Sequence, residues 1–465
     1  MYKYTRAYNL FKSQIITVNI NKLYISIFLF LIVYLFCWWS NPTLMPKINL
    51  GDTPGYLSVA KDFSATQTEI RPFFFPLIIR ICMNISELHW ERILSIFQIS
   101  LHSIVCVVIF HFYSKHNFNC IISIILTLLI GFNPSLIYWS TYLMPDFLLA
   151  VLTTLAWIFF VIFIHQFDRN NKINIFLVFS GIFCGLAIVT KPISMLSIVP
   201  FLFTFIIISK NSLNMLKAIT LIIIINFSFH VSWERYKEYN DSTSTFEILD
   251  FIAYPINMTA IRGGLVDYGK GTPLYDRIDE KNLLDTARQF KIKLSYTMDT
   301  DPVYWKFNKS LSWDIKNDKK FAQSILDQVP EKLFIYSISN WHAFFTKRSF
   351  GPGEGSFPNM PKMIRYLYIV GYALLYRPFL VILLLSSCII LWRKNLLTLL
   401  ISSAGILLYA SLSIALLTPH GGEFPRYRVW IEYIMFFCAL FPIGILMEFY
   451  SRKLFSMFGQ LITKS

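Results

Sequence analysis

The chain has 465 residues, of which 55% are hydrophobic and 17% aromatic, whereas only 15% are charged. Soluble domains carry about 25% charged residues, so this composition excludes an ordinary soluble globular protein. The formal net charge is +15, but segment 234–365 holds 19 basic and 17 acidic residues, so most of the excess lies beside apolar segments. Charge in that position sets membrane topology and attracts lipid phosphates, and it argues against a nucleic-acid partner.

Apolar runs near the length of a bilayer recur along the chain, without the two-residue alternation of a membrane β-barrel. Because lipid-exposed backbone must satisfy its own hydrogen bonds, the sequence predicts an all-α polytopic membrane protein. Segment 365–376 reads as an interfacial helix or as part of an eleventh span. The ten predicted spans are 23–39, 93–113, 118–138, 147–167, 173–189, 195–209, 216–232, 378–392, 396–417 and 429–449.

Ten spans put both ends of the chain on one side of the membrane, and basic connections identify that side as cytoplasmic. The exoplasmic side then receives loop 41–92, turn 140–146, the turn at Lys191, segment 233–362 and turn 418–428. The basic residues in the cytoplasmic connections are Lys115, Arg169, Lys172, Lys210, Lys217, Arg393, Lys394, Arg452 and Lys453.

Three regions follow: an N-terminal membrane module at 1–232 with its first exoplasmic loop, an insertion at 233–362, and C-terminal membrane helices at 363–465. The insertion carries 17 of the chain's 27 acidic residues. It is predicted to be a soluble exoplasmic unit, mixed but mostly helical, with helical periodicity clearest at 278–290 and 320–334.

Two acidic residues lie where exoplasmic loops meet predicted helices. Asp52 opens GDTPGYLSVAKDF (51–63), where Pro54 in the first turn predicts a helix start. Asp146 lies in STYLMPDF (140–147), at the entrance of a span. Each is either a helix cap or a general base, and acids at neighbouring span entrances can converge in a bundle. Convergence would make them a catalytic pair.

Four basic residues lie in exoplasmic turns beside prolines, where the positive-inside rule gives no reason for a cation: Arg71, Lys191, Arg426 and Arg428. A single such residue is commonly an interfacial side chain that snorkels. As a set they predict a phosphate clamp, because Arg binds phosphate through two parallel bonds and Lys supplies a point charge.

Five segments, in this order along the chain, resemble the glycosyltransferase C (GT-C) superfamily of membrane enzymes. The likeness is greatest to the bacterial branch with aminoarabinose transferases and protein mannosyltransferase-like proteins. It extends over about two-thirds of the chain and over none of the insertion. The segments are GDTPGYLSVAKDF (51–63), IRPFFFPL (70–77), YLMPDFLLA (142–150), GLAIVTKP (185–192) and PRYRVWIEY (425–433).

The resemblance implies a role for each matching residue. Asp52 matches the first-loop catalytic acid, Tyr56 the tyrosine one turn on, Arg71 the basic residue near the carrier phosphate, and Asp146 the second-loop acid. Many relatives have an acidic pair in the first loop, whereas here Asp52 is followed by Thr53. The dependence of the reaction on a divalent metal is therefore left open. The sequence assigns no cofactor and no metal ligand.

The resemblance implies a hexosyl- or pentosyltransferase. It would move a sugar from a polyprenyl-phosphate carrier, such as undecaprenyl phosphate, to a cell-envelope glycan (lipopolysaccharide, for example), lipid or protein, with Asp52 as general base. The expected location is the inner (cytoplasmic) membrane, with the active site facing the periplasm or the outside. The sequence contains no Gly-rich phosphate loop, which agrees with a donor that is not a nucleotide sugar. Two alternatives remain: a transporter or flippase of lipid-linked saccharides, and an oligosaccharide ligase or polymerase.

Overall fold

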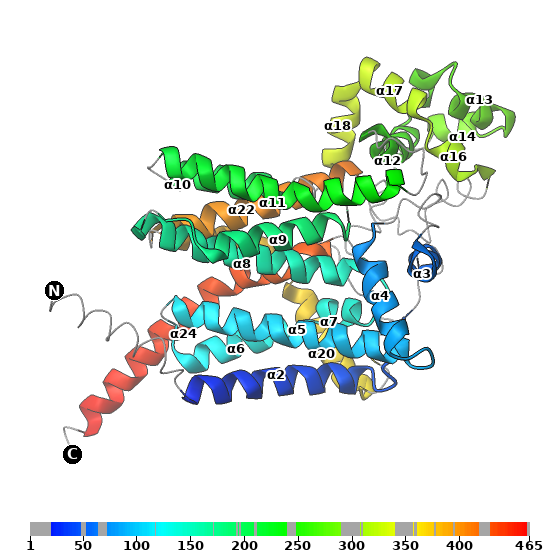
Figure 1. Ribbon diagram of the computed structural model, residues 1–465. Coiled ribbons are helices and arrows are strands. Elements are labelled where there is room, and N and C mark those ends of the chain that lie inside the picture. Colours follow the sequence, from blue (N-terminus) through cyan, green and yellow to red (C-terminus); the bar gives the residue numbers. More distant parts are fainter. Residues whose placement is uncertain are drawn as a thin grey trace.

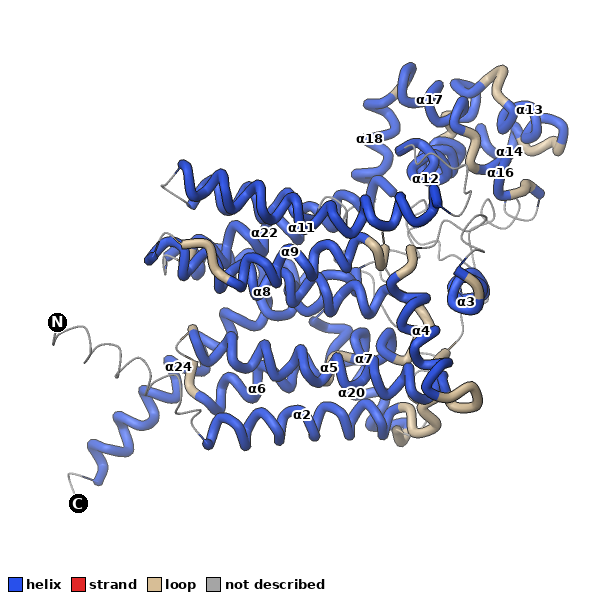
Figure 2. Tube along the Cα trace, viewed as in Figure 1, coloured by secondary structure: helices blue, strands red, loops and turns tan. Residues whose placement is uncertain are grey.

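The computed structural model is a bundle of helices that run side by side, with a smaller helical group projecting from one end (Figure 1). Short connections join many of the helices, and the described residues contain no strand, only an isolated β-bridge (Figure 2). The structure describes residues 20–47, 53–63, 72–116, 118–170, 172–191, 194, 197–208, 212–239, 248–289, 307, 310–339, 357, 360–375, 378–393, 396–417 and 428–462.

The helices of the bundle come from both halves of the chain. From the first half they are α2 (Ile20–Ser40), α3 (Thr53–Lys61), α4 (Phe74–Ile85), α5 (Trp90–Lys115), α6 (Cys120–Gly131), α7 (Pro134–Ser140), α8 (Pro145–Asn170), α9 (Ile175–Ile188), α10 (Ile198–Ile208) and α11 (Ser212–Tyr239). From the second half they are α20 (Lys362–Leu375), α21 (Pro378–Arg393), α22 (Leu397–Leu417), the 3-10 turn η5 (Val429–Ile431) and α24 (Glu432–Ile462).

All ten predicted spans fall on helices of this bundle. Among the described residues, six helices are long and apolar enough to cross a membrane, and the pair α6–α7 makes a seventh if it acts as one span. Helices α9, α10 and α21 are apolar but shorter, with 14, 11 and 16 residues. The chain is thus an all-α polytopic membrane protein, as its composition predicts.

The predicted span 118–138 is divided into two helices that meet at 53°. The side chain of Asn133 accepts a hydrogen bond from the backbone N–H of Ser135, and Pro134 is the first residue of α7. Asparagine is a favoured N-cap and proline cannot extend the preceding helix, so this dipeptide ends α6 and starts α7. The bend brings the end of α7 to the loop that leads into α8.

Helices α8 and α24 form the centre of the bundle, because 83% of each of their apolar windows is buried, against 17% for α11. Hydrogen bonds between side chains join the central helices to their neighbours. The indole N–H of Trp157 on α8 donates to Ser402 Oγ on α22 at 3.0 Å. The indole N–H of Trp430 donates to Thr153 Oγ1 at 2.6 Å, which fixes η5 on α8.

The insertion has a core of its own, made by α12 (Ile248–Arg262), α13 (Pro273–Glu280), α14 (Leu284–Gln289), α16 (Trp313–Lys316), α17 (Lys319–Gln328) and α18 (Pro330–Ser339). Both stretches with predicted helical periodicity are helical, but each is interrupted. Asn282, at φ 53°, separates α13 from α14, and Pro330 starts α18 directly after α17. Left-handed backbone and proline each end a helix, whereas apolar periodicity continues through them.

Most of segment 365–376, predicted as an interfacial helix or as part of an eleventh span, lies in helix α20, which docks on α6. Tyr372 Oη donates to the carbonyl of Leu129 at 2.8 Å, and Tyr368 Oη donates to the carbonyl of Phe132. These carbonyls belong to the last turn of α6 and the residue after it, where no intrahelical donor is available. Helix α20 therefore covers the open end of α6 at the α6–α7 bend.

Candidate active site

The loop after α2 is fastened to the turn between α7 and α8 by main-chain hydrogen bonds. The N–H of Lys47 donates to the carbonyl of Thr141 at 2.7 Å, and the N–H of Leu143 donates to the carbonyl of Lys47 at 2.9 Å. Lys47 and Tyr142 thereby form a parallel β-bridge. Two segments almost a hundred residues apart are held side by side.

The predicted helix start near Asp52 is present, since α3 begins at Thr53. Asp52 itself lies outside the described residues. The Thr53 side chain is fully buried, and its hydroxyl donates to the carbonyl of Leu143 at 3.2 Å. Leu143 is three residues before Asp146. The residue that follows Asp52 is therefore bonded to the turn that carries the second predicted acid.

Tyr56 lies one turn into α3 and is 2% exposed. Its ring meets the ring of Phe75 on α4 edge to face, with centroids 5.6 Å apart. Edge-to-face aromatic pairs add to the stability of apolar contacts. Tyr56 therefore holds α3 against α4, and the substrate contact implied for it remains a prediction.

The segment that contains Arg71 lies beside the turn that contains Lys191. The N–H of Phe74, the first residue of α4, donates to the carbonyl of Val189 at 3.0 Å. Arg71 lies outside the described residues, three positions before that bond. Lys191 follows Val189 by two positions. The two predicted phosphate-binding segments are thus joined at the backbone.

Asp146 and Lys191 form an ion pair between these loops. The Lys191 Nζ donates to Asp146 Oδ1 at 2.5 Å, and the two side chains are 13% and 3% exposed. Helix α8 begins at Pro145, so Asp146 lies in its first turn, where the helix dipole also favours a carboxylate. Both residues were singled out separately in the sequence, and the structure brings them into direct contact.

Arg428, the last of the predicted cations, is buried with an acidic partner. Its side chain and that of Glu432 are both 0% exposed, and Arg428 Nε lies 3.9 Å from Glu432 Oε2. Ser135 Oγ on α7 donates to the same Glu432 oxygen at 2.9 Å. Trp430, two residues after Arg428, is bonded to Thr153, which lies about two turns along α8 from Asp146. Arg426 lies outside the described residues.

Lys47 is a further cation of this region, outside the set of four predicted from the sequence. Its ammonium lies 4.4 Å from the centre of the Tyr138 ring and 5.8 Å from that of Tyr142. Burial lowers the pKa of Lys47 from its usual 10.5 to about 8. Its position after Pro46, outside the first span, is the same signal that selected the other four cations.

We expect the Lys47→Met variant to be more stable than the wild type at pH 7. Below pH 8 the folded wild type holds a desolvated ammonium, which methionine avoids. Between pH 8 and 10.5 the unfolded chain binds more protons than the folded one, so wild-type stability rises with pH. Thermal unfolding in lipid nanodiscs should show a higher unfolding temperature for the variant than for the wild type at pH 7, and this difference should shrink by pH 9.5. A difference independent of pH would contradict the burial argument.

A metal site is not apparent in the part of the chain that the structure describes, where no three His, Cys, Asp or Glu side chains form a group. His89 precedes α5 and is exposed, while His342 and His420 lie outside the described residues. Asp146 is paired with Lys191. The divalent metal that the sequence leaves open gains no ligand set from these residues.

The bundle and its joined, charged loops define a polytopic membrane protein with polar residues gathered at one end. Residues 70–233, about a third of the chain, match the model of the dolichyl-phosphate-mannose-protein mannosyltransferase family. This segment contains Phe74, Asp146 and Lys191. Over this third of its length the chain is therefore similar to a glycosyltransferase family.

Two solved structures resemble the chain weakly, and no curated protein matches it at a significant level. ArnT from Cupriavidus metallidurans in the apo state is 12% identical, with 86% of this chain and 77% of ArnT covered and a TM-score of 0.33. ArnT from the same organism bound to undecaprenyl phosphate is 13% identical over the same shares, with a TM-score of 0.34. Scores this low do not establish a shared arrangement of helices.

Proposed function

We propose that the chain transfers a sugar from a polyprenyl-phosphate carrier to a cell-envelope glycan, lipid or protein on the exoplasmic face of the inner membrane. Asp52 is the general base, and Arg71, Lys191 and Arg426 bind the carrier phosphate, with Asp146 holding Lys191 in place. Arg428, predicted with them, is buried beside Glu432 and is given no phosphate contact in this proposal. The name of the matched family describes transfer from a dolichyl-phosphate-linked sugar, which is a donor of this chemical class.

The observation that carries the proposal is the convergence of three loops. Thr53 is bonded to Leu143, Phe74 is bonded to Val189, and the Lys191 ammonium reaches the Asp146 carboxylate. Asp52 directly precedes the first of these contacts. A site made from loops on a rigid helical support can place a base and several cations around one reacting centre.

The reaction needs a base at the acceptor and positive charge at the leaving group. The Asp52 carboxylate takes the proton of the acceptor hydroxyl, whose oxygen attacks the anomeric carbon of the sugar. The bond from that carbon to the carrier phosphate breaks, and the phosphate departs with the electron pair. Arg71 and Arg426 offset its growing negative charge. The Asp146 carboxylate, which is paired with Lys191, holds the Lys191 ammonium near the departing phosphate.

A donor comparison tests the function. Purified protein in nanodiscs should consume a polyprenyl-monophosphate sugar in the presence of envelope extract as acceptor, and release polyprenyl phosphate. A polyprenyl-diphosphate oligosaccharide should not serve, because the proposed leaving group is a monophosphate. Preferred use of the diphosphate donor would indicate a ligase or polymerase. Movement of labelled donor across vesicles without any transfer would indicate a flippase.

Cysteine labelling tests the face on which the reaction is proposed. Lys270→Cys, at an exposed position of the insertion, should react with a membrane-impermeant maleimide in intact cells or spheroplasts. Asn170→Cys, at the last residue of α8, should react only after permeabilisation. The basic residues Arg169 and Lys172 beside it favour the cytoplasm. The reverse labelling pattern would contradict the proposed face.

A further inference from the structure

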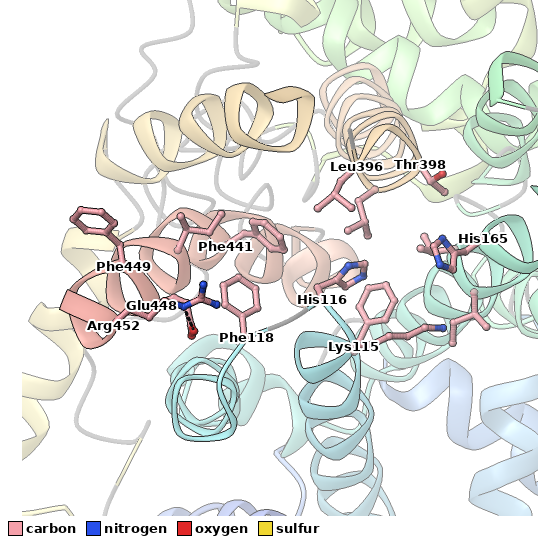
Figure 3. A pocket seen from close by; sticks show the side chains of 15 residues that line it. Lys115, His116, Phe118, His165, Leu396, Thr398, Phe441, Glu448, Phe449 and Arg452 are labelled. Atoms are coloured by element: carbon pink, nitrogen blue, oxygen red, sulfur yellow. Dashed lines mark hydrogen bonds and ion pairs between the residues drawn. The ribbon is translucent and has the colours of Figure 1, made fainter. Parts of the chain in front are cut away.

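A cavity of about 790 Å³ lies at the other end of the bundle (Figure 3). It is surrounded by the last turn of α5, the second half of α8, the start of α22 and the middle of α24. His165 lines it, and 19 residues of α8 separate His165 from Asp146, a distance of roughly 28 Å along the helix. The cavity is therefore near the membrane face opposite the candidate active site.

The shape of α24 creates one wall of this cavity. Pro442 lies inside α24, and proline bends a helix by removing a hydrogen bond and crowding the preceding turn. Figure 1 shows the end of α24 leaving the bundle. Phe441, Ile445 and Phe449 follow each other at helical spacing on the wall, and Phe449 is 61% exposed. The wall is apolar and continues onto a surface suited to lipid.

Basic side chains collect at the cavity. Lys115, His116 and His165 lie around the same space in Figure 3, and Arg452 lies at its edge. Glu448 is the single acid among the lining residues, and its oxygens accept from Arg452 Nε at 3.1 Å and from a backbone N–H of α6's cap residue at 3.0 Å. The acid is thus occupied by protein donors.

His116 offers a donor to this space. Its Nε2 is buried without a hydrogen-bond partner among the residues that the structure describes. Burial, followed by the charge of Lys115 and the proximity of His165, lowers the pKa of His116 to about 4. The ring is therefore neutral at pH 7, where one of its nitrogens carries a hydrogen and can donate a hydrogen bond to an anionic oxygen.

We propose that this cavity binds an anionic phospholipid, with the phosphate at Lys115 and His116 and an acyl chain along Phe441 and Phe449. Basic pockets between membrane helices at the cytoplasmic side are suited to such headgroups. The apolar wall favours a lipid over a soluble anion, since a free phosphate would leave that wall uncovered. The site is independent of the proposed transfer reaction and lies at the opposite membrane face.

Native mass spectrometry of the full-length protein in detergent tests the proposal. We expect one dioleoyl-phosphatidylglycerol to bind more tightly than all further copies, while dioleoyl-phosphatidylcholine and inorganic phosphate do not compete. Lys115→Gln and Arg452→Gln should each weaken this binding by about fivefold, the effect of one basic residue near anionic lipid. Both side chains are exposed, so neither variant should alter folding, which circular dichroism can verify.

Matched variants separate the cavity from general surface charge. Lys172→Gln and Lys453→Gln remove one positive charge from the same end of the bundle without touching the cavity, and binding should be unchanged. Equal weakening in the control and cavity variants would overturn the proposal, as would no weakening in either. Competition by inorganic phosphate would indicate a soluble-anion site. If undecaprenyl phosphate displaced dioleoyl-phosphatidylglycerol at a concentration below that of the phospholipid, the proposal would be overturned and the cavity assigned to a carrier lipid.

Discussion

Asp52→Asn is expected to abolish sugar transfer and to leave the amount of folded protein nearly unchanged. Asparagine keeps the ability to cap the start of α3, whereas its amide cannot take a proton from an acceptor hydroxyl. The loss should be at least 100-fold, the lower range for a general base. Turnover of a polyprenyl-phosphate sugar in nanodiscs, normalised to protein level, measures it.

A control on the same helix makes this result interpretable. Asp62 directly follows α3 and is exposed, so Asp62→Asn makes the same chemical change at the opposite end of the helix. It should retain wild-type turnover. Normal turnover by Asp52→Asn would remove Asp52 from the catalytic role, and the base would have to be sought elsewhere.

Asp146→Asn is expected to cost stability as well as activity. The Asp146 side chain is 3% exposed and that of Lys191 is 13% exposed, so the variant leaves a largely buried ammonium without its carboxylate. Removal of one member of a buried pair costs about 3–5 kcal/mol. Transfer should fall severely without being abolished, because the proposed base remains. Unfolding in mixed detergent micelles measures the stability.

The double variant Asp146→Asn, Lys191→Gln distinguishes the two effects. It removes both charges, so it should recover most of the stability that Asp146→Asn loses. Transfer should stay low, because the proposed cation near the carrier phosphate is also absent. Asp168→Asn, exposed near the end of α8, is the matched control and should be neutral. Full recovery of transfer in the double variant would make the pair purely structural.

The helices could be predicted from the sequence because apolar runs of membrane length have few alternative structures. Their interruptions were harder to predict, since Asn133 and Pro134 divide an apolar run without lowering its mean hydropathy. The same holds for Asn282, which ends α13 inside a periodic stretch. Local backbone chemistry decides such breaks, and apolar periodicity does not report it.

The candidate site could be predicted as a set of charges on one side, but not as a set of pairs. Asp146 reads equally well as a cap and as a base until Lys191, 45 residues later, is seen beside it. The role of Lys47 depends on its burial beside Tyr138 and Tyr142, which its own sequence neighbourhood does not indicate. Glu432 likewise depends on partners from different elements, Arg428 and Ser135. Contacts between residues that are far apart in the chain cannot be predicted from local sequence patterns.

The bonds that join the three loops run mostly through main-chain atoms, which has an evolutionary consequence. The N–H groups of Lys47, Phe74 and Leu143 and the carbonyls of Thr141 and Val189 are present whatever side chains these positions carry. The backbone bonds themselves do not depend on the side chain at these positions, with proline as the exception for the three donors, because it lacks the N–H. Related chains can therefore diverge far in these loops and still keep the same loop connections.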